Sequence, residues 1–352
     1  MSIASSLYAV AARTRRAWYA ARPDWRRRLE RPVISVGNVA VGGSGKTPTV
    51  AHVAKLLVDL GERPAILTRG YARAKVSDGV TVVSDGTRLM ADVDRAGDEP
   101  LMLARQLPTV PVLVSADRYL AGLLAERRLG CTVHVLDDGF QHFQLERELD
   151  LVIVSPDDVE QPLTLPAGGL REPLDVVRCA SALLVSGADH AQASALGAAV
   201  GVPEVFRLRR FVDRPRLVEP AGRVVSPAAG TRILAVAGLA RPGRFFADLA
   251  ESGWTVASEM SFGDHHRFTH PDLARIVAEM RAVRAVMVVT TEKDLVRLLP
   301  LRPLPMPVAW VPMQVAIEPA AEFRAWLAGR LTRRAEETGR GRRPQAGGRE
   351  PE

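Results

Sequence analysis

The chain has 352 residues, of which 47% are hydrophobic and 25% charged, so it is no disordered polymer and is long enough for two domains. Its two cysteines, Cys131 and Cys179, match no disulfide framework or metal-ligand spacing, and we expect free thiols. The net charge of +7 comes from the two ends, which are rich in arginine, while the body is nearly neutral. Because only 5% of residues are aromatic and the excess charge is terminal, we expect no nucleic-acid partner.

The first predicted element is a basic amphipathic helix within residues 1–30. At about 100° per residue one apolar stripe is formed by Ile3, Leu7, Val10, Ala11, Thr14, Trp18 and Ala21. Arg13 interrupts the apolar run, which is then too short for a transmembrane span, and no cleavage site indicates a signal peptide. Two alternatives stay open, namely docking on a membrane surface and packing on the protein's own core.

Residues 31–210 alternate between apolar runs and helical spacing. Strands are predicted at 32–37, 64–68, 79–84, 110–114, 132–138, 150–154 and 181–186, and helices at 47–61, 100–107 and 118–130. Such alternation predicts an α/β domain whose mainly parallel sheet is flanked by helices on both faces.

The remaining chain divides into three predicted segments. Residues 211–230 are charged, rich in proline and without helical period, which favours an extended linker. Residues 231–332 predict a second, smaller α/β domain, with strands at 232–240, 254–258 and 285–290 and helices at 244–253, 271–283, after Thr291 and at 318–332. Residues 333–352 are rich in Gly, Arg and Glu and predict a disordered basic tail.

The stretch "SVGNVAVGGSGKTPTV" (35–50) joins a predicted buried strand to a predicted helix through a glycine-rich loop. Ala40 stands where the usual phosphate-loop pattern has its first glycine, so an ordinary glycine-rich turn is the alternative. A loop before a helix presents backbone N–H groups to phosphate, Lys46 can reach the outer phosphates, and the Thr47 hydroxyl can ligate Mg²⁺. We expect a phosphate-loop NTPase-like domain that binds nucleotide phosphates and Mg²⁺ through Gly42, Gly43, Ser44, Gly45, Lys46, Thr47 and Pro48.

Acidic residues follow the strand predicted at 132–138. Asp137 and Asp138 close the run "TVHVLDD", and carboxylates at the end of a parallel strand lie where such sheets bind ligands. They could hold Mg²⁺, as the acidic strand of phosphate-loop enzymes does, or form an ordinary Asp-Gly turn.

Two further stretches could supply proton chemistry. In "RAGDEPLMLA" (95–104), Asp98 or Glu99 either caps the helix that starts near Pro100 or lies on a loop as the base for an incoming hydroxyl. In "FGDHHRF" (262–268), the two loop histidines either have no catalytic role or reach that carboxylate from the second domain, where one of them would orient it and shift its pKa.

Several motifs then resemble a known family. The stretches "ISVGNVAVGGSGKTP", "LTRGYAR", "GDEPLMLA", "SADR", "VLDDGFQH", "GGLREP", "VAGLARPGRFF", "FGDHHRF" and "VVTTEKD" resemble, in order, the tetraacyldisaccharide 4'-kinases of Gram-negative lipid A synthesis. The resemblance covers about residues 30–300 and implies transfer of the ATP γ-phosphate to the 4'-hydroxyl of tetraacyldisaccharide 1-phosphate, which gives lipid IVA. It also implies an enzyme at the cytoplasmic face of the inner membrane, docked through the N-terminal helix, and we expect a monomer.

The resemblance also implies roles for individual residues. Lys46 and Thr47 would hold phosphates and Mg²⁺, Asp137 and Asp138 would take the acidic-strand position, and Asp98 would deprotonate the sugar hydroxyl together with His265. His266 is the alternative to His265 if the loop register shifts. Four more residues match family motifs on the substrate side, namely Arg118, His142, Arg171 and Glu172.

Other functional classes remain as alternatives. A soluble small-metabolite kinase would share the loop and the base but would not need a cationic amphipathic N-terminus. A nucleotide switch would use the loop to change conformation, but "TTEKDL" (290–295) lacks the residue between Lys and Asp that a guanine-reading motif needs. For the kinase we expect closure between the two domains, because the base and the histidine come from opposite sides.

Overall fold

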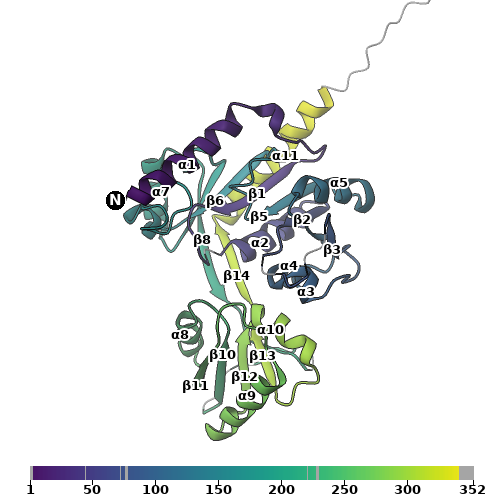
Figure 1. Ribbon diagram of the computed structural model, residues 1–352, viewed down its shortest axis with the longest axis vertical. Coiled ribbons are helices and arrows are strands. Elements are labelled where there is room, and N and C mark those ends of the chain that lie inside the picture. The colour runs from purple at the N-terminus through teal and green to yellow at the C-terminus, as the bar shows by residue number, and fades with distance from the viewer. Residues whose placement is uncertain are drawn as a thin grey trace, which may run out of the picture.

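The computed structural model describes residues 3–340 apart from 44, 72, 76–77, 220 and 227–229, with side chains described as far as residue 334. Two sheets form two units that lie one above the other in Figure 1. The upper unit holds nine strands and the lower unit five.

The nine-stranded sheet has the order β14-β8-β7-β6-β1-β5-β2-β4-β3. Its seven parallel strands are β1 (Val33–Asn38), β2 (Pro64–Thr68), β4 (Val112–Val114), β5 (Val133–Asp137), β6 (Leu149–Val154), β7 (Ala182–Ser186) and β8 (Val205–Val212). The two edge strands, β3 (Thr81–Ser84) and β14 (Met313–Glu318), are antiparallel to their neighbours. The prediction of a mainly parallel sheet is confirmed, because apolar runs such as that of β1 are buried along their whole length.

Helices cover both faces of this sheet. One core packs α2 (Lys46–Asp59), α4 (Asp98–Gln106) and α11 (Ala320–Arg340) on one face. Two other clusters involve α5 (Arg118–Leu129) and α7 (His190–Val200). The shorter elements of this unit are η1 (Pro23–Trp25), α3 (Val93–Ala96), α6 (Pro156–Glu160) and η2 (Leu174–Cys179).

The five-stranded sheet has the order β11-β10-β12-β13-β9. Its strands are β9 (Arg216–Leu217), β10 (Arg232–Ala237), β11 (Thr255–Ser261), β12 (Met287–Thr291) and β13 (Val308–Val311), of which only β9 is antiparallel to its neighbour. Its helices are α8 (Gly243–Glu251), α9 (His270–Ala282), α10 (Glu292–Leu298) and η3 (Leu299–Leu301). Separate apolar clusters include α8 and α9, so this unit has helices on both faces as well.

The strand pairing differs from the expected boundaries of the second domain. β14 and most of α11 fall within 231–332 but belong to the first unit, because β14 pairs with β8 from Met313↔Val212 to Glu318↔Arg207 and α11 packs into the first core. The expected linker 211–230 likewise contains β9, which pairs with β13 in the second sheet. The chain therefore enters the second unit after β8 and returns through β14, and Figure 1 shows these two strands side by side where the units meet.

The C-terminal helix extends beyond its predicted end at residue 332. α11 runs to Arg340, and an ion pair of 3.0 Å between Arg334 Nη2 and Glu148 Oε1 ties its later part to the first unit. The rest of the expected disordered tail lies outside the described residues.

The N-terminal helix α1 (Ile3–Ala20) packs on the protein through one face and leaves apolar residues exposed on the other. Its Ser5 and Ala9 are buried, and the Thr164 hydroxyl donates to the Ser5 carbonyl at 3.0 Å, so one face packs on the protein. The opposite face leaves Ile3, Leu7 and Val10 exposed by 83%, 66% and 59%. No helix in the described part of the chain has the length and apolar character needed to cross a membrane.

Replacing Phe323 tests whether α11 is part of the first core. Its ring is 1% exposed and packs 5.0 Å from Phe206 of β8, so Phe323→Ala should lower the free energy of unfolding by about 3–5 kcal/mol, measured by urea denaturation. The exposed neighbour Glu322→Gln is the control and should change it by less than about 1 kcal/mol. Equal stability of the two variants would contradict the packing.

Candidate active site

The glycine-rich loop connects β1 to α2, as expected for a phosphate cradle. Gly42 and Gly45 have φ of 108° and 86°, left-handed conformations that side chains disfavour, and Gly45 is the N-cap of α2. Lys46, the first residue of α2, donates from Nζ to Asn38 Oδ1 at 3.1 Å, and burial lowers the pKa of its ammonium. Gly43 lies in the loop between Gly42 and Gly45, and Pro48 lies in the first turn of α2. Ser44 lies outside the described residues.

The predicted acidic pair lies at the end of β5, beside the loop. Asp137 is buried and accepts a hydrogen bond from the Thr68 hydroxyl at 3.3 Å. Burial raises the pKa of Asp137, and the nearby carboxylates of Glu99 and Asp138 raise it further. Asp138 follows in a left-handed conformation, with φ of 53°, and its Oδ1 lies 3.8 Å from Lys46 Nζ.

These residues fit a magnesium ion by their chemistry. The Thr47 hydroxyl, Asp137 and Asp138 offer only oxygen ligands, and Asp138 Oδ1 is buried without a hydrogen-bond partner among the described residues. No group of three or more His, Cys, Asp or Glu side chains in the described chain could form a metal cage. Mg²⁺ usually binds one or two carboxylates together with substrate phosphates, so two carboxylates are the expected set.

The structure brings Asp98 and His265 into contact across the two units. Asp98 is the first residue of α4, after the N-cap Gly97, so the expectation that it lies on a loop is wrong. Its Oδ2 lies 2.8 Å from Nδ1 of His265, which belongs to the loop between β11 and α9 and has φ of 57°. The alternative His266 instead contacts Asp272 at 3.0 Å near the start of α9. His265 is thus the histidine that meets the carboxylate.

Two cations that sequence reasoning missed surround this pair. Arg297 of α10 donates from Nη2 to Asp98 Oδ2 at 2.5 Å, and Lys293 Nζ lies 3.3 Å from His265 Nε2. Burial alone would raise the pKa of Asp98, but the hydrogen bonds and charges of Arg297 and His265 lower it. The available signal was their spacing of four residues in "EKDLVR", which puts both on one helical face.

Glu99 links this pair to the phosphate loop. Its Oε2 accepts from the Thr47 hydroxyl at 3.3 Å, and its Oε1 lies 3.5 Å from Lys293 Nζ. The base candidate, the second-unit cations and the predicted magnesium ligand Thr47 therefore occupy one continuous site.

The four residues predicted on the substrate side form a group that Arg171 joins to Asp138. Arg171 Nη1 donates to Asp138 Oδ2 at 2.7 Å, and Arg118 is buried at the start of α5 with its pKa lowered to about 10 by burial, then by Arg69. Burial, followed by the charge of Arg118, lowers the pKa of His142 to about 3, so this imidazole is neutral.

Glu172, the fourth of them, connects the site to α1. It is buried and accepts two hydrogen bonds from Arg16, at 2.7 and 2.8 Å. Gln141 Nε2 donates to Glu172 Oε1 and to the Asn38 carbonyl, both at 3.0 Å. The Asn38 side chain also accepts a hydrogen bond from Lys46 Nζ, so hydrogen bonds connect the N-terminal helix to the phosphate loop. Arg16, Gln141 and Asn38 were not singled out from the sequence.

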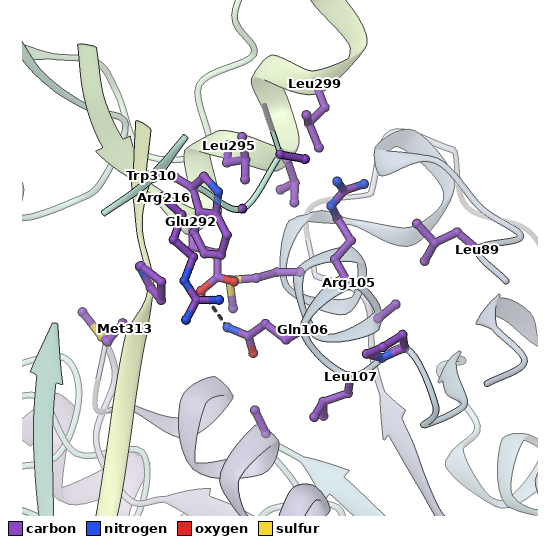
Figure 2. A pocket seen from close by; sticks show the side chains of 18 of the residues that line it. Leu89, Arg105, Gln106, Leu107, Arg216, Glu292, Leu295, Leu299, Trp310 and Met313 are labelled. Atoms are coloured by element: carbon purple, nitrogen blue, oxygen red, sulfur yellow. Dashed lines mark hydrogen bonds between the residues drawn. The ribbon is translucent and has the colours of Figure 1, made fainter. Parts of the chain in front are cut away.

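A separate cavity of about 710 Å³ lies between the units on another side of α2 and α4. Of the predicted site residues only Pro48 lines it, so it is distinct from the Asp98 site. Figure 2 shows Arg216, Glu292 and Trp310 on one side, Arg105 on the other, and the hydrogen bond of 2.6 Å from Gln106 to Glu292. Burial raises the pKa of Glu292 to about 7.

The nine-stranded, mainly parallel sheet, with a phosphate loop after β1 and carboxylates at the end of the neighbouring β5, defines a phosphate-loop NTPase-like protein. Comparisons with known proteins narrow this class. The family model of tetraacyldisaccharide-1-P 4'-kinase matches residues 1–332. The chain belongs to this family.

Individual relatives agree with this assignment. A tetraacyldisaccharide 4'-kinase of Geobacter metallireducens is 39% identical over 306 residues, with 85% of this chain and 88% of the relative covered. Another from Anaeromyxobacter sp. is 41% identical over 315 residues, covering 85% and 82%. A crystal structure of LpxK from Aquifex aeolicus in complex with ATP matches with a TM-score of 0.74 and 33% identity over 93% of this chain and 97% of that one.

The raised pKa of Glu292 predicts that the free energy of unfolding depends on pH. Its ordinary pKa of 4.5 is raised to about 7 in the folded chain, so the folded state holds this proton more tightly and loses stability as pH rises between these values. Glu292→Gln should remove this loss, worth up to roughly 3 kcal/mol, and flatten the pH dependence seen in urea unfolding. The exposed Glu259→Gln should keep the wild-type slope. Identical slopes for all three proteins would contradict the shift.

Proposed function

We propose that this chain transfers the γ-phosphate of ATP to the 4'-hydroxyl of tetraacyldisaccharide 1-phosphate and so produces lipid IVA, in lipid A synthesis. Family membership supports the reaction, and the observation that carries the mechanism is the Asp98–His265 contact of 2.8 Å beside the phosphate loop. A carboxylate from one unit and a histidine from the other fit a base that forms where the units meet.

The nucleotide would bind to the loop at the start of α2. Backbone N–H groups from Gly42 to Thr47 and the helix dipole would hold the phosphates, and the Lys46 ammonium would neutralise their charge. Thr47, Asp137 and Asp138 would hold Mg²⁺, which supplies charge neutralisation for phosphoryl transfer when bound. The raised pKa of Asp137 fits this role, because a divalent cation would favour its ionised form.

The acceptor hydroxyl would approach Oδ1 of Asp98, because Arg297 and His265 both contact the other carboxyl oxygen, Oδ2. Asp98 takes the hydroxyl proton, the oxygen attacks the γ-phosphorus, and ADP leaves with the electrons of the broken bond. Positioning and electrostatics contribute most of the acceleration in such reactions, which accounts for a site assembled from two units. Closure of the units would complete it. We place Arg118, His142, Arg171 and Glu172 on the acceptor side.

We also infer that the enzyme works on the cytoplasmic face of the inner membrane, docked through α1. A glycolipid with several acyl chains leaves a bilayer at a cost of about 0.8 kcal/mol per CH₂, so its kinase gains by reaching the surface. The exposed Ile3, Leu7 and Val10 fit insertion, and the bidentate Arg16–Glu172 pair fixes the helix relative to the site. Since one chain supplies both Asp98 and His265, we infer a monomer.

Transfer of radiolabelled γ-phosphate from ATP to purified tetraacyldisaccharide 1-phosphate in detergent micelles tests the reaction. Wild-type protein should label the glycolipid, and Asp98→Asn should lower kcat by about 10²–10⁴, because it removes the general base. The control Asp59→Asn, at the exposed end of α2, should retain wild-type activity. Labelling of a small soluble sugar but not of the glycolipid would contradict the proposal.

Membrane docking is tested on the exposed stripe without deleting the helix. The triple variant Ile3→Ser, Leu7→Ser and Val10→Ser should bind vesicles of phosphatidylethanolamine and phosphatidylglycerol at least about a hundredfold more weakly in a sedimentation assay, because it removes three inserting side chains. A control with Leu120→Ser and Val286→Ser, exposed by 43% and 54% elsewhere, should bind as wild type does. Equal binding of the two variants would show that α1 does not dock.

A further inference from the structure

The Asp98–His265 pair is enclosed by cations from one face of α10. Arg297 and Lys293 lie four residues apart, so both side chains leave the helix on the same side. Arg297 is buried, and its Nη1 donates to Asp294 Oδ1 at 3.0 Å and to the Gly238 carbonyl at 3.1 Å. Because Asp294 is itself held by the Thr291 hydroxyl at 2.6 Å, the guanidinium has little freedom to move.

The hydrogen bonds distinguish the two oxygens of Asp98. Oδ2 accepts from Arg297 Nη2 at 2.5 Å and lies 2.8 Å from His265 Nδ1. No side chain in the described part of the molecule donates to Oδ1. An ionised carboxylate retains acceptor sites on both oxygens, so Oδ1 is the oxygen that can take a proton from an incoming hydroxyl.

The contacts of His265 also distinguish its two nitrogens. An ammonium group has only donors, so Lys293 Nζ at 3.3 Å requires Nε2 to be the acceptor. Nδ1 faces a carboxylate oxygen at 2.8 Å and must carry the proton. Arg297 Nη2 also lies 3.3 Å from Nδ1, but its proton has the nearer acceptor in Asp98 Oδ2. Both contacts therefore favour neutral imidazole with its proton on Nδ1.

Without Lys293 the surroundings of Nε2 would be acidic. Asp264 Oδ2 lies 3.8 Å from Nε2, and Glu99 and Asp264 otherwise share the Lys293 ammonium at 3.5 and 3.8 Å. Lys293 thus neutralises the carboxylates of Asp264 and Glu99 while it donates to Nε2. Among the described side chains only Lys293 places a donor at Nε2.

We propose that Lys293 and Arg297 are positioning residues that fix the tautomer of His265 and the oxygen of Asp98 that stays open to the acceptor. Lys293 donates to Nε2 and so holds the ring proton on Nδ1, and Arg297 occupies Oδ2 so that Oδ1 receives the hydroxyl proton. The proposal rests on the proposed function for its use in phosphoryl transfer, but the tautomer itself belongs to the folded protein. In the transfer step the hydroxyl O–H bond breaks and its hydrogen forms a bond to Oδ1. The oxygen uses the freed electron pair to bond to the γ-phosphorus, while the bond from that phosphorus to the ADP oxygen breaks and its electrons leave with ADP.

Nitrogen NMR of histidine-labelled full-length protein at neutral pH tests the tautomer without any turnover. Wild type should show the Nδ1–H tautomer at His265, with the signal assigned by its loss in His265→Gln. Lys293→Met should lose the preference for this tautomer, because no described side chain then donates to Nε2, and Lys293→Arg, which keeps a donor, should preserve the wild-type signal. The control Lys75→Met, at a side chain 70% exposed, should change nothing. An Nε2–H tautomer in wild type, or an unchanged signal in Lys293→Met, would overturn the proposal.

Kinetics of the glycolipid reaction supply the second readout. Lys293→Met should lower kcat by about 10–100-fold, the range typical of residues that orient a functional group, with KM for ATP changed less than about threefold. Arg297→Lys keeps the charge but loses the fixed fork geometry, so it should lower kcat likewise and leave the tautomer intact. A rise in KM for ATP at constant kcat would assign Lys293 to phosphate binding and overturn its positioning role. Inactive wild type with the Nδ1–H tautomer would reject only the proposed function.

Discussion

The contact between Asp98 and Arg297 is the constraint on which the rest of the site depends. It joins the first turn of α4 to α10, and so connects the two sheets at the point where the base candidate lies. A carboxylate and a guanidinium that are both largely withdrawn from water must remain paired, because either alone would be a costly buried charge. The pair therefore fixes the relative position of the units locally, and His265, Lys293 and Glu99 are arranged around it.

Charge is balanced similarly around the phosphate loop. Asp137 and Asp138 place negative charge beside Lys46, while Arg171 and Arg118 neutralise it from the other side. The orphaned Oδ1 of Asp138 is a buried acceptor that a cation would satisfy. The phosphate loop and the acidic strand end thus form one electrostatic unit, which the Arg16–Glu172–Gln141 hydrogen bonds extend to α1. A helix with exposed apolar residues is in this way held rigidly against the nucleotide site.

The fold was predictable from sequence to the extent that its signals are local. Buried parallel strands such as β1 and β7 are mainly apolar runs, and α2, α5 and α9 show helical spacing with clear start residues, so these elements were found close to their observed positions. The pairing of β14 with β8 was not found, because the two segments are about a hundred residues apart and no local pattern indicates which sheet a short strand joins. The expected boundary of the second domain was wrong for this reason.

For the site, the sequence by itself determined the chemistry of the loop and the acidic strand. Gly42 to Thr47 come shortly after β1 and Asp137–Asp138 stand at the end of β5, and the carboxyl ends of parallel strands meet at one edge of a sheet. Only the tertiary structure decided which histidine meets Asp98, that α10 contributes Lys293 and Arg297, and that α1 leaves its apolar stripe exposed. These depend on contacts between segments distant in the chain, where the packing of two units selects one partner among many of the same chemical type.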